Sequence, residues 1–380
     1  MTLLDARPLA QVIYRRFPSY WTAGLEAFQG WRHGGERPPA RLDVMTSIGG
    51  SNLDVLQVLL QSLAETHPRD RIQFWLFYMR LAPQDLTDLS AFVERLPNLT
   101  LHPVQVQERK DFDLLSKLGQ KPYGARFLWY TAHLYLPADI KRIIYLDPLD
   151  TIVTNDLLPF LKQPLLGQYL AACREAPFAP PLICGPARQA AARGASPDKI
   201  RRISKGVLNS GAIVINLDKL RRDRVGIDAY IETARWAQAE MGLSFGDQGL
   251  FSLTHGSNYV RAHDRYNFRF HDAPARGPRL PPAVVHFAGR ISKPFHLRLT
   301  PDQERQITAA LDRTGARELP LNPTQKIKRH DLAYYRQWWD ICARTPVYDR
   351  IAPLAGAYAT KVLSEQLPAL QDTSVTPSAR

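Results

Sequence analysis

The chain has 380 residues, of which 45% are hydrophobic and 22% charged, so it has the composition of a globular protein with a sizeable core. Lys and Arg exceed Asp and Glu by 13, which favours anionic partners such as nucleotide phosphates or an anionic membrane surface; without a zinc-finger or RNA-recognition signature, nucleic acid is not an expected partner. No apolar run reaches the roughly 20 residues of a transmembrane helix and the amino terminus is a poor signal peptide, so we expect a cytoplasmic location.

Residues 1–40 form an expected amino-terminal arm that mixes aromatic and basic residues and ends in a Gly/Pro-rich break at 34–39. Such an arm can lie on a membrane interface. It can also be an irregular segment that packs on the main domain, and both interpretations remain open at this point.

From residue 41 onward, strand-like and helix-like patterns alternate along the chain. The first half predicts strands at 42–47, 72–79, 99–106 and 142–146, with helices at 53–65, 84–95 and 125–136. The second half predicts strands at 207–217 and 283–287, with helices at 228–239 and from Asp247. Strands that alternate with helices predict an α/β fold, with a mainly parallel central sheet covered by helices on both faces.

Composition shifts divide the chain further. Residues 174–206 are rich in Ala, Pro, Gly and basic residues and are expected to form an excursion near the site. From residue 299 the pattern becomes helical and basic, and the last residues are rich in Ser, Thr and Pro, as in disordered tails. We expect four parts: the arm, a main domain at 41–298, a helical carboxyl-terminal extension at 299–371 and a disordered tail at 372–380.

The most informative stretch is 141–153, where an apolar strand runs into two carboxylates. Pro148 cannot continue a central ladder, so Asp147 and Asp150 should lie at the carboxyl end of the strand, where open α/β sheets have their ligand crevices. Close carboxylates repel unless a cation lies between them, and Mg²⁺ or Mn²⁺ prefers such ligands. Taken alone, the same residues could simply form a turn.

Four further segments place polar groups at a predicted strand end or helix start. They are 209–211 (Asn-Ser-Gly), 246–248 (Gly-Asp-Gln), 286–289 (His-Phe-Ala-Gly) and 293–295 (Lys-Pro-Phe). Each alone would be a turn, a helix cap or a structural residue. Their order along the chain is more informative than their individual identities.

In that order the motifs resemble the retaining glycosyltransferases of family 8, which include glycogenin and bacterial lipopolysaccharide galactosyl- and glucosyltransferases. The resemblance also includes 46–47 (Thr-Ser), Arg126 and 266–268 (Tyr-Asn-Phe), and it runs from about 41 to 295. It implies a GT-A fold, which is Rossmann-like. It also implies transfer of a hexose from UDP-glucose or UDP-galactose to a saccharide or lipid-linked saccharide, in lipopolysaccharide or surface-polysaccharide assembly.

The resemblance assigns roles to single residues. The ligands of Mn²⁺ or Mg²⁺ would be Asp147, Asp150 and His286. The diphosphate would meet Lys293, Gly289 and Arg126, and Arg126 could also reach the sugar. The donor sugar would be held by Asn209, Asp247 and Gln248. Because an amide is a poor nucleophile, Gln248 near the anomeric carbon favours front-face substitution over a covalent intermediate.

The sequence departs from the family's pattern at three places. The acidic motif is Asp-x-x-Asp rather than Asp-x-Asp, and one extra residue in an extended chain turns a side chain to the other face. The spacing from Gly289 to Lys293 is one residue longer, and Phe295 replaces the usual Trp. The first strand ends without the acid that usually binds uracil or ribose, which leaves Ser47 and Asn52 as candidates for that contact.

Two other functions remain open. A sugar-nucleotide nucleotidyltransferase would use a similar sheet and metal site, but residues 48–52 have glycines without the Lys or Arg of a phosphate loop. A catalytically lapsed nucleotide-sugar-binding module would explain the altered acidic motif. Under the first hypothesis, the basic excess and the aromatic ends suit peripheral contact with the inner face of the cell membrane.

Overall fold

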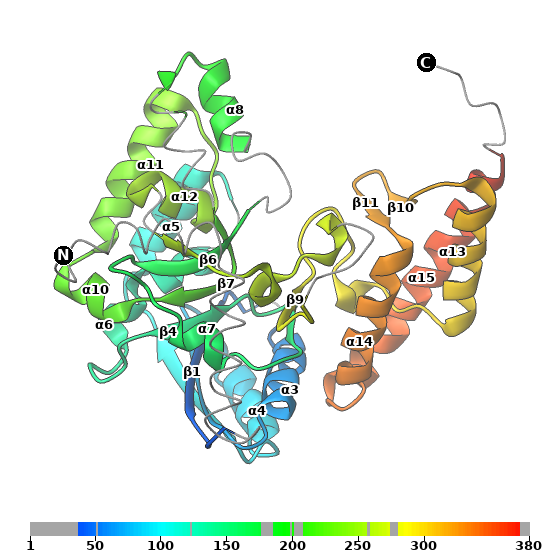
Figure 1. The fold of residues 1–380 in the computed structure, drawn as a ribbon, viewed down its shortest axis with the longest axis horizontal. Coiled ribbons are helices and arrows are strands. Elements are labelled where there is room, and N and C mark those ends of the chain that lie inside the picture. The colour runs from blue at the N-terminus through cyan, green and yellow to red at the C-terminus, as the bar shows by residue number, and fades with distance from the viewer. Residues whose placement is uncertain are drawn as a thin grey trace, which may run out of the picture.

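A computed structural model describes residues 37–372, apart from 51, 122–123, 176–184, 198–199, 201–207, 257–258 and 274–279. Nearly all of the expected arm, much of the 174–206 excursion and the expected tail lie outside the described residues, so those interpretations stay predictions. An α/β body and a helical body are joined through the segment around β9 (Figure 1).

A seven-stranded sheet with the order β3-β2-β1-β4-β7-β6-β8 forms the centre of the α/β body. All neighbouring strands pair in parallel except β7, which runs antiparallel to β4 and β6. The predicted mainly parallel sheet is therefore confirmed, with one reversed strand. The strands are β1 (Arg41–Ile48), β2 (Arg71–Tyr78), β3 (Leu99–Gln105), β4 (Ile143–Leu146), β6 (Leu170–Arg174), β7 (Leu208–Ile215) and β8 (Tyr259–Arg261).

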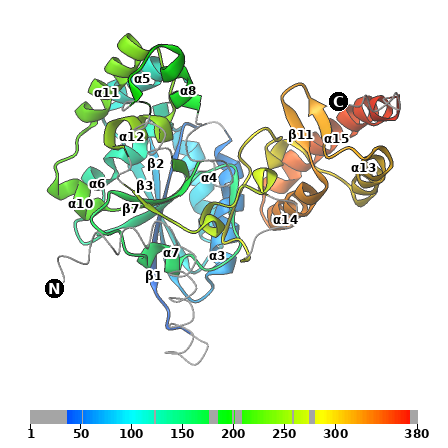
Figure 2. The same cartoon turned by 45° about the horizontal axis from the view of Figure 1, so that its top comes forward.

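Helices cover both faces of this sheet (Figure 2). Every residue of β4 is buried, and its alternate side chains enter two different cores, with Tyr145 in one and Leu146 in the other. This is why the strand reads as a continuous apolar run. The core with Tyr145 includes residues of α5 (Arg109–Gly119), α11 (Ile227–Met241) and α12 (Asp247–His255), and the core with Leu146 includes residues of α3 (Leu56–Thr66), α4 (Pro83–Val93) and α7 (Leu158–Lys162).

One predicted helix differs in the structure. The segment 125–136 is mostly a 3₁₀-helix, η2 (Gly124–Thr131), followed by the single turn of α6 (Ala132–Tyr135). All residues of η2 except Arg126 are buried. The segment is thus packed on nearly all sides, and this tertiary packing outweighs the α-helical propensity of its residues. The sequence did not predict α5, β6, β8, α10 (Leu217–Arg222) or β5 (Thr151–Val153). The strand predicted at 283–287 is present as β9 (Val284–His286), which pairs antiparallel with β5 in a short ribbon outside the central sheet.

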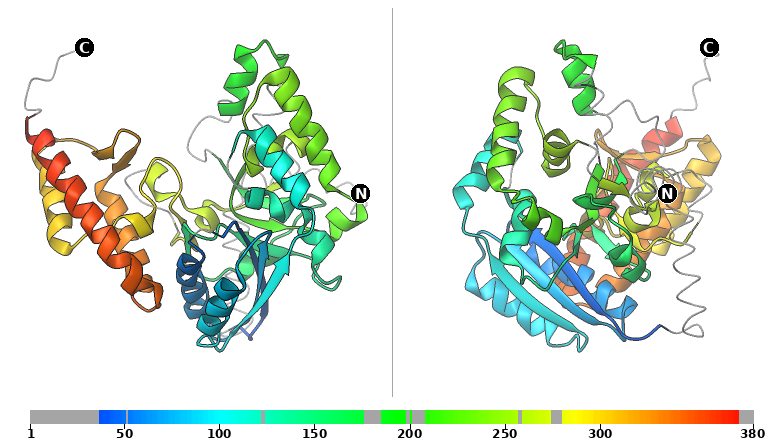
Figure 3. Two further views of the ribbon diagram at one scale, coloured as in Figure 1. Left: turned by 180° about the vertical axis from the view of Figure 1, so that it is seen from behind. Right: turned by 60° about the vertical axis from the view of Figure 1, so that its left-hand side comes forward.

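The helical body contains α13 (Pro301–Thr314), α14 (Leu332–Cys342) and α15 (Val347–Asp372). The predicted helical extension is thus present, whereas its antiparallel hairpin of β10 (Leu319–Asn322) and β11 (Gln325–Ile327) was not predicted. The start of α15 lies against the α3 region (Figure 3), where the Val347 N–H donates to Gln57 and Arg350 pairs with Asp54. The boundary at residue 299 stays a prediction. Within the described part of the chain, no helix combines the length and apolar character needed to cross a membrane.

Candidate active site

The predicted carboxylates lie just beyond the end of β4. The Asp147 N–H donates to the Gly211 carbonyl at 2.9 Å, which extends the pairing with β7 by one step. The chain then bends through Pro148, and the Thr151 hydroxyl closes the bend by donating to the Asp147 carbonyl at 2.6 Å. Because the extra residue of the motif lies in a bend and not in extended chain, the two carboxylates do not have to face opposite sides.

The pairing of β5 with β9 brings His286 to these carboxylates. Thr151 is opposite His286 in the ladder, and the Phe287 N–H donates to the Asp150 carbonyl at 2.8 Å. His286 Nε2 lies 3.6 Å from Asp150 Oδ1 and 3.9 Å from Asp147 Oδ2. One ligand atom from each of the three residues lies within 4.8 Å of the others, so the three predicted metal ligands converge.

Two features fit this trio to a divalent ion. Asp150 Oδ1 is buried and has no hydrogen-bond partner among the described residues, which is costly for a carboxylate oxygen unless a cation is present. The donor set of two carboxylates and one imidazole suits a borderline ion such as Mn²⁺. The residues present therefore fit the metal that the sequence suggested.

Lys293, in the loop after β9, adds a positive charge to the site. Its ammonium donates to Asp150 Oδ2 and to the Phe287 carbonyl, the latter at 3.2 Å. Burial disfavours the charged form of Asp150, but Lys293 and His286 outweigh it and hold the pKa of this carboxyl below its ordinary value. Burial and the charge of Asp150 raise the pKa of Asp147 to about 7. Asp147 still exposes 42% of its side chain, so an ion or ligand can reach it.

A chain of buried hydrogen bonds connects His286 to Asn209. His286 Nδ1 donates to Asn267 Oδ1 at 2.8 Å, so Nε2 presents its lone pair to the carboxylates. Asn267 Nδ2 in turn donates to Asn209 Oδ1 at 2.7 Å, and Asn209 Nδ2 donates to Glu175 at 2.7 Å. Asn267 belongs to the Tyr-Asn-Phe motif at 266–268, but the sequence gave it no role, and Glu175 was missed because no local pattern marks its position.

The start of α12 lies beside the start of β7. Because β7 is reversed, its first residues share an edge of the sheet with the carboxyl end of β4. The Ser210 N–H donates to Gln248 Oε1 at 3.3 Å, and Trp129 Nε1 donates to Asp247 Oδ2 at 3.1 Å. Arg126 Nη1 comes within 3.5 Å of the place that a Cβ on Gly246 would occupy. Arg126 Nε is buried without a hydrogen-bond partner among the described residues, so this guanidinium keeps donor capacity.

A cavity of about 350 Å³ lies among these groups, within the usual range of ligand sites. The structure brings five of the residues predicted from sequence into its walls. Gly289 lies apart, in the exposed turn before Lys293, where its φ of +99° favours glycine. The five lining residues are Ser47, Asn52, Arg126, Asp147 and Asp247.

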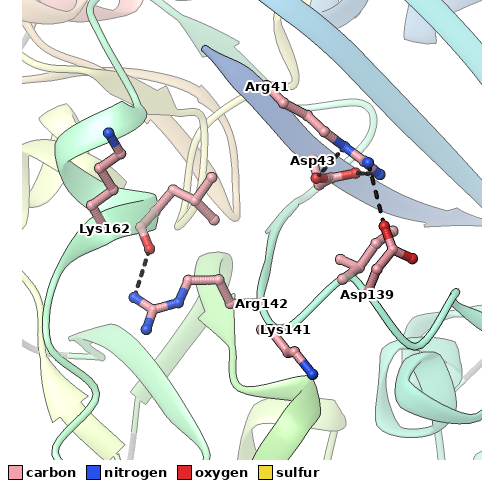
Figure 4. A pocket seen from close by; sticks show the side chains of 8 residues that line it. Arg41, Asp43, Asp139, Lys141, Arg142 and Lys162 are labelled. Carbon is pink, nitrogen blue, oxygen red and sulfur yellow. Dashed lines mark hydrogen bonds and ion pairs between the residues drawn. The ribbon is translucent and has the colours of Figure 1, made fainter.

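A larger cavity of about 580 Å³ lies at the opposite edge of the sheet, where β1 and β4 begin (Figure 4). Four of its charged groups bind one another or the backbone. Arg41 pairs with Asp43 and Asp139, while Arg142 donates to the carbonyls of Leu161, in α7, and of Gln163, just after it. Few groups there are left to converge on a ligand.

A second group of possible metal ligands consists of His67, Asp70 and Asp156. Arg37 already lies between its carboxylates, with hydrogen bonds to both, and the Leu157 N–H donates to His67 Nε2 at 3.0 Å. The protein therefore supplies the cation itself. This cluster fixes the start of the described chain to the body of the protein.

Solved structures with the same fold are known. No curated sequence matches the chain significantly. The galactosyltransferase LgtC, in complex with donor and acceptor sugar analogues, has a TM-score of 0.50 and 19% identity over 67% of this chain and 90% of LgtC. The bifunctional glycosyltransferase WbbM has a TM-score of 0.53 and 14% identity over 83% of this chain and 51% of WbbM. The glycosyltransferase GlyE from Streptococcus pneumoniae TIGR4 has a TM-score of 0.50 and 15% identity over 87% of this chain and 63% of GlyE. At these identities the likeness shows a shared GT-A fold.

The family model described as glycosyl transferase family 8 matches residues 40–297, which is more than half of the chain. This range contains every site residue predicted from the sequence. The chain belongs to glycosyl transferase family 8 and is a glycosyltransferase.

Proposed function

We propose that this glycosyltransferase moves a hexose from UDP-glucose or UDP-galactose to a saccharide or lipid-linked saccharide, with retention of configuration and with the help of Mn²⁺. The observation that carries the proposal is the convergence of Asp147, Asp150 and His286, of which Asp147 also lines the 350 Å³ cavity. The LgtC complex with donor and acceptor sugar analogues supports a galactosyl or related donor.

Asp147, Asp150 and His286 would hold the ion. When bound, Mn²⁺ acts as a Lewis acid and neutralises the charge that develops on the departing UDP. Asn267 keeps the Nε2 lone pair of His286 directed at the carboxylates. The buried, unpartnered Asp150 Oδ1 gains a cation partner in this arrangement.

Lys293 would contact the diphosphate as a point charge. Its ammonium lies on Asp150 in the structure, so a phosphate oxygen placed next to Asp150 would be within its reach. Arg126 lines the 350 Å³ cavity and has unused donor capacity. Together these two cations would stabilise the leaving group.

Asn209, Asp247 and Gln248 would hold the hydroxyls of the donor sugar. The Trp129 indole fixes one carboxylate oxygen of Asp247, and the Ser210 N–H fixes the Gln248 amide, so both groups are oriented before substrate arrives. Since an amide is a poor nucleophile, we favour front-face attack, in which a phosphate oxygen of the departing UDP accepts the proton of the acceptor hydroxyl. An adduct on Asp247 or Gln248, detected by mass spectrometry, would contradict this mechanism.

The cellular setting belongs to the same proposal. The surplus of basic residues would favour the anionic inner face of a cell membrane, where lipid-linked acceptors of surface polysaccharides are found. A flotation assay with and without anionic lipid tests this part. Equal partition onto neutral and anionic vesicles would remove it.

The test of activity uses the full-length protein with Mn²⁺ and a panel of UDP-sugars. We expect slow Mn²⁺-dependent release of UDP, and an α-configured sugar product by NMR. Asp150→Asn should abolish this release, whereas Asp139→Asn, which changes an exposed carboxylate at the opposite edge, should not.

Two outcomes would favour the other functions. A folded protein that releases no UDP from any sugar nucleotide would support a binding module without catalysis. Release of pyrophosphate from UTP in the presence of a sugar phosphate would support a nucleotidyltransferase.

A further inference from the structure

The 3₁₀ geometry of η2 brings two of its side chains to the start of α12. A 3₁₀-helix turns once every three residues, so side chains three positions apart lie on the same side of it. Arg126 and Trp129 have this spacing: Arg126 Nη1 lies 3.5 Å from the place of a Cβ on Gly246, and Trp129 Nε1 donates to Asp247 Oδ2. In the α-helix that the sequence predicted, the same two side chains would be turned apart by about 60°.

Asp247 is held through both its side chain and its backbone. The Trp129 indole N–H donates to Asp247 Oδ2 at 3.1 Å, and the Tyr130 hydroxyl donates to the Asp247 carbonyl. The other carboxylate oxygen, Oδ1, accepts no hydrogen bond from a described residue, and Asp247 lines the 350 Å³ cavity. Asp247 thus keeps one carboxylate oxygen for a ligand while the other is anchored.

The indole that anchors Asp247 is itself tightly packed. Trp129 is 1% exposed, and its ring centre lies 5.6 Å from that of Phe251 in α12 and 6.2 Å from that of Tyr145 in β4. A buried indole N–H needs a hydrogen-bond acceptor, and among the described residues Asp247 is the one that Trp129 has. The direction of the Asp247 carboxylate is therefore set by the packing of Trp129 between the sheet and α12.

We propose that Trp129 is a positioning residue that sets the selectivity of the enzyme for the transferred sugar. The inference rests on the proposed function, in which Asp247 accepts hydrogen bonds from hydroxyls of that sugar. A carboxylate without an anchor can rotate to meet hydroxyls in several orientations, whereas the anchored carboxylate presents Oδ1 in one direction. Related sugars differ in the position or presence of single hydroxyls, so a fixed acceptor rejects those that cannot make its hydrogen bond.

Calorimetry with the full-length protein and Mn²⁺ tests this role. The probes are UDP, which lacks the transferred sugar, and four UDP-sugars. UDP-galactose, UDP-N-acetylglucosamine and UDP-xylose each differ from UDP-glucose at one carbon of the sugar. We expect Trp129→Phe to leave UDP affinity unchanged and to weaken binding of the preferred UDP-sugar by about threefold to tenfold, the value of about one hydrogen bond. The affinity ratio between the preferred sugar and the next one should fall by a similar factor.

Two further variants separate this role from a general effect of losing an indole. Trp236→Phe is the matched control, because Trp236 also donates its indole N–H to a carboxylate, that of Glu240, but on the exposed side of α11. It should leave both UDP affinity and the preference among UDP-sugars unchanged. If Trp129 acts through Asp247, then adding Trp129→Phe to Asp247→Ala should not change the preference among UDP-sugars any further.

The contrary outcomes are distinct. Unchanged UDP-sugar affinities in Trp129→Phe would overturn the inference and leave the proposed function intact. Equal loss of UDP and UDP-sugar affinity would also overturn it, because the substitution would then act on the whole site. So would an effect of Trp129→Phe that is as large in the Asp247→Ala protein as in the unmodified one. If the unmodified protein binds no UDP-sugar with Mn²⁺, the proposed function fails, and the inference fails with it.

Discussion

Gly211 offers a sharp test of the metal site, because the imidazole of His286 lies against its Cα. A Cβ added at this position would be 2.1 Å from His286 Cε1 and 2.2 Å from Nδ1. Ordinary contact begins near 3.4 Å, so in Gly211→Ala the ring or the strand has to move by about 1.3 Å, the difference between 3.4 and 2.1. The ring is held by Asn267 and by β9, and β7 is a buried central strand, so neither moves freely.

The expected result follows from that displacement. Moving Nε2 by more than 1 Å from its position 3.6 Å from Asp150 Oδ1 should lower Mn²⁺ affinity by about tenfold to a hundredfold, as when groups that orient metal ligands are lost. The forced packing should also destabilise the fold by about 1–3 kcal/mol. Calorimetry with Mn²⁺ in the presence of UDP measures the first effect, and urea unfolding of the metal-free protein measures the second.

Two further variants separate a local effect from general damage. Gly356→Ala, in α15, places its Cβ in open space and should leave Mn²⁺ affinity unchanged. If Gly211→Ala acts through His286, then combining it with His286→Ala should lower Mn²⁺ affinity no further than His286→Ala alone. A Gly211→Ala protein with the Mn²⁺ affinity and stability of the unmodified enzyme would refute the reasoning.

Three more outcomes are expected. The raised pKa of Asp147, about 7 against an ordinary 3.8, means that the metal-free folded state gains stability from this carboxyl below its ordinary pKa and loses it as the pH rises through 7. Mn²⁺ needs the charged carboxylate, so calorimetry at several pH values should show affinity rising from about pH 6 to about pH 8; a flat profile would contradict the assignment. Lys293→Ala should weaken UDP binding by about tenfold to a hundredfold in the same assay, and an unchanged affinity would exclude its phosphate contact. Arg37→Ala removes the arginine that pairs with buried Asp70 and should lower the free energy of unfolding, measured with urea, by about 2–3 kcal/mol. The control Arg305→Ala removes one partner of an exposed ion pair and should change it by less than about 0.5 kcal/mol. Equal effects of the two substitutions would refute the structural role of Arg37.

The site was only partly predictable from the sequence. Asp147 was placed correctly because an apolar run followed by Pro148 marks a strand end, and Asp247 because it opens a helix. The spacing of Asp147 and Asp150 left their orientation open. In an extended chain, the two side chains would point to opposite faces. The chain instead forms a bend, which the Thr151 hydroxyl closes, so the two carboxylates do not have to point apart. The residue roles themselves stay proposals until they are measured.

Other contacts could not be predicted from any local pattern. The motif at 266–268 marked the position of Asn267, but its hydrogen bonds to His286 and Asn209 join residues that are far apart in the sequence. The cation in the second acidic cluster comes from Arg37, far from Asp156 in sequence. Such pairs are invisible to periodicity, since nothing near either residue depends on the other.

The sequence by itself determined the α/β class, the mainly parallel sheet, the helical extension and the family, because buried strands and helices impose their periods on the residues that form them. Only the tertiary structure decided that Asp147, Asp150 and His286 converge. That convergence depends on the pairing of β5 with β9. The three residues of β5 are too short to show a period, and the pattern that predicted a strand at 283–287 does not say which strand it pairs with. It also decided that α15 and the β10–β11 hairpin close a cavity next to Asn52, because contacts between distant segments are selected by the packing of the whole chain.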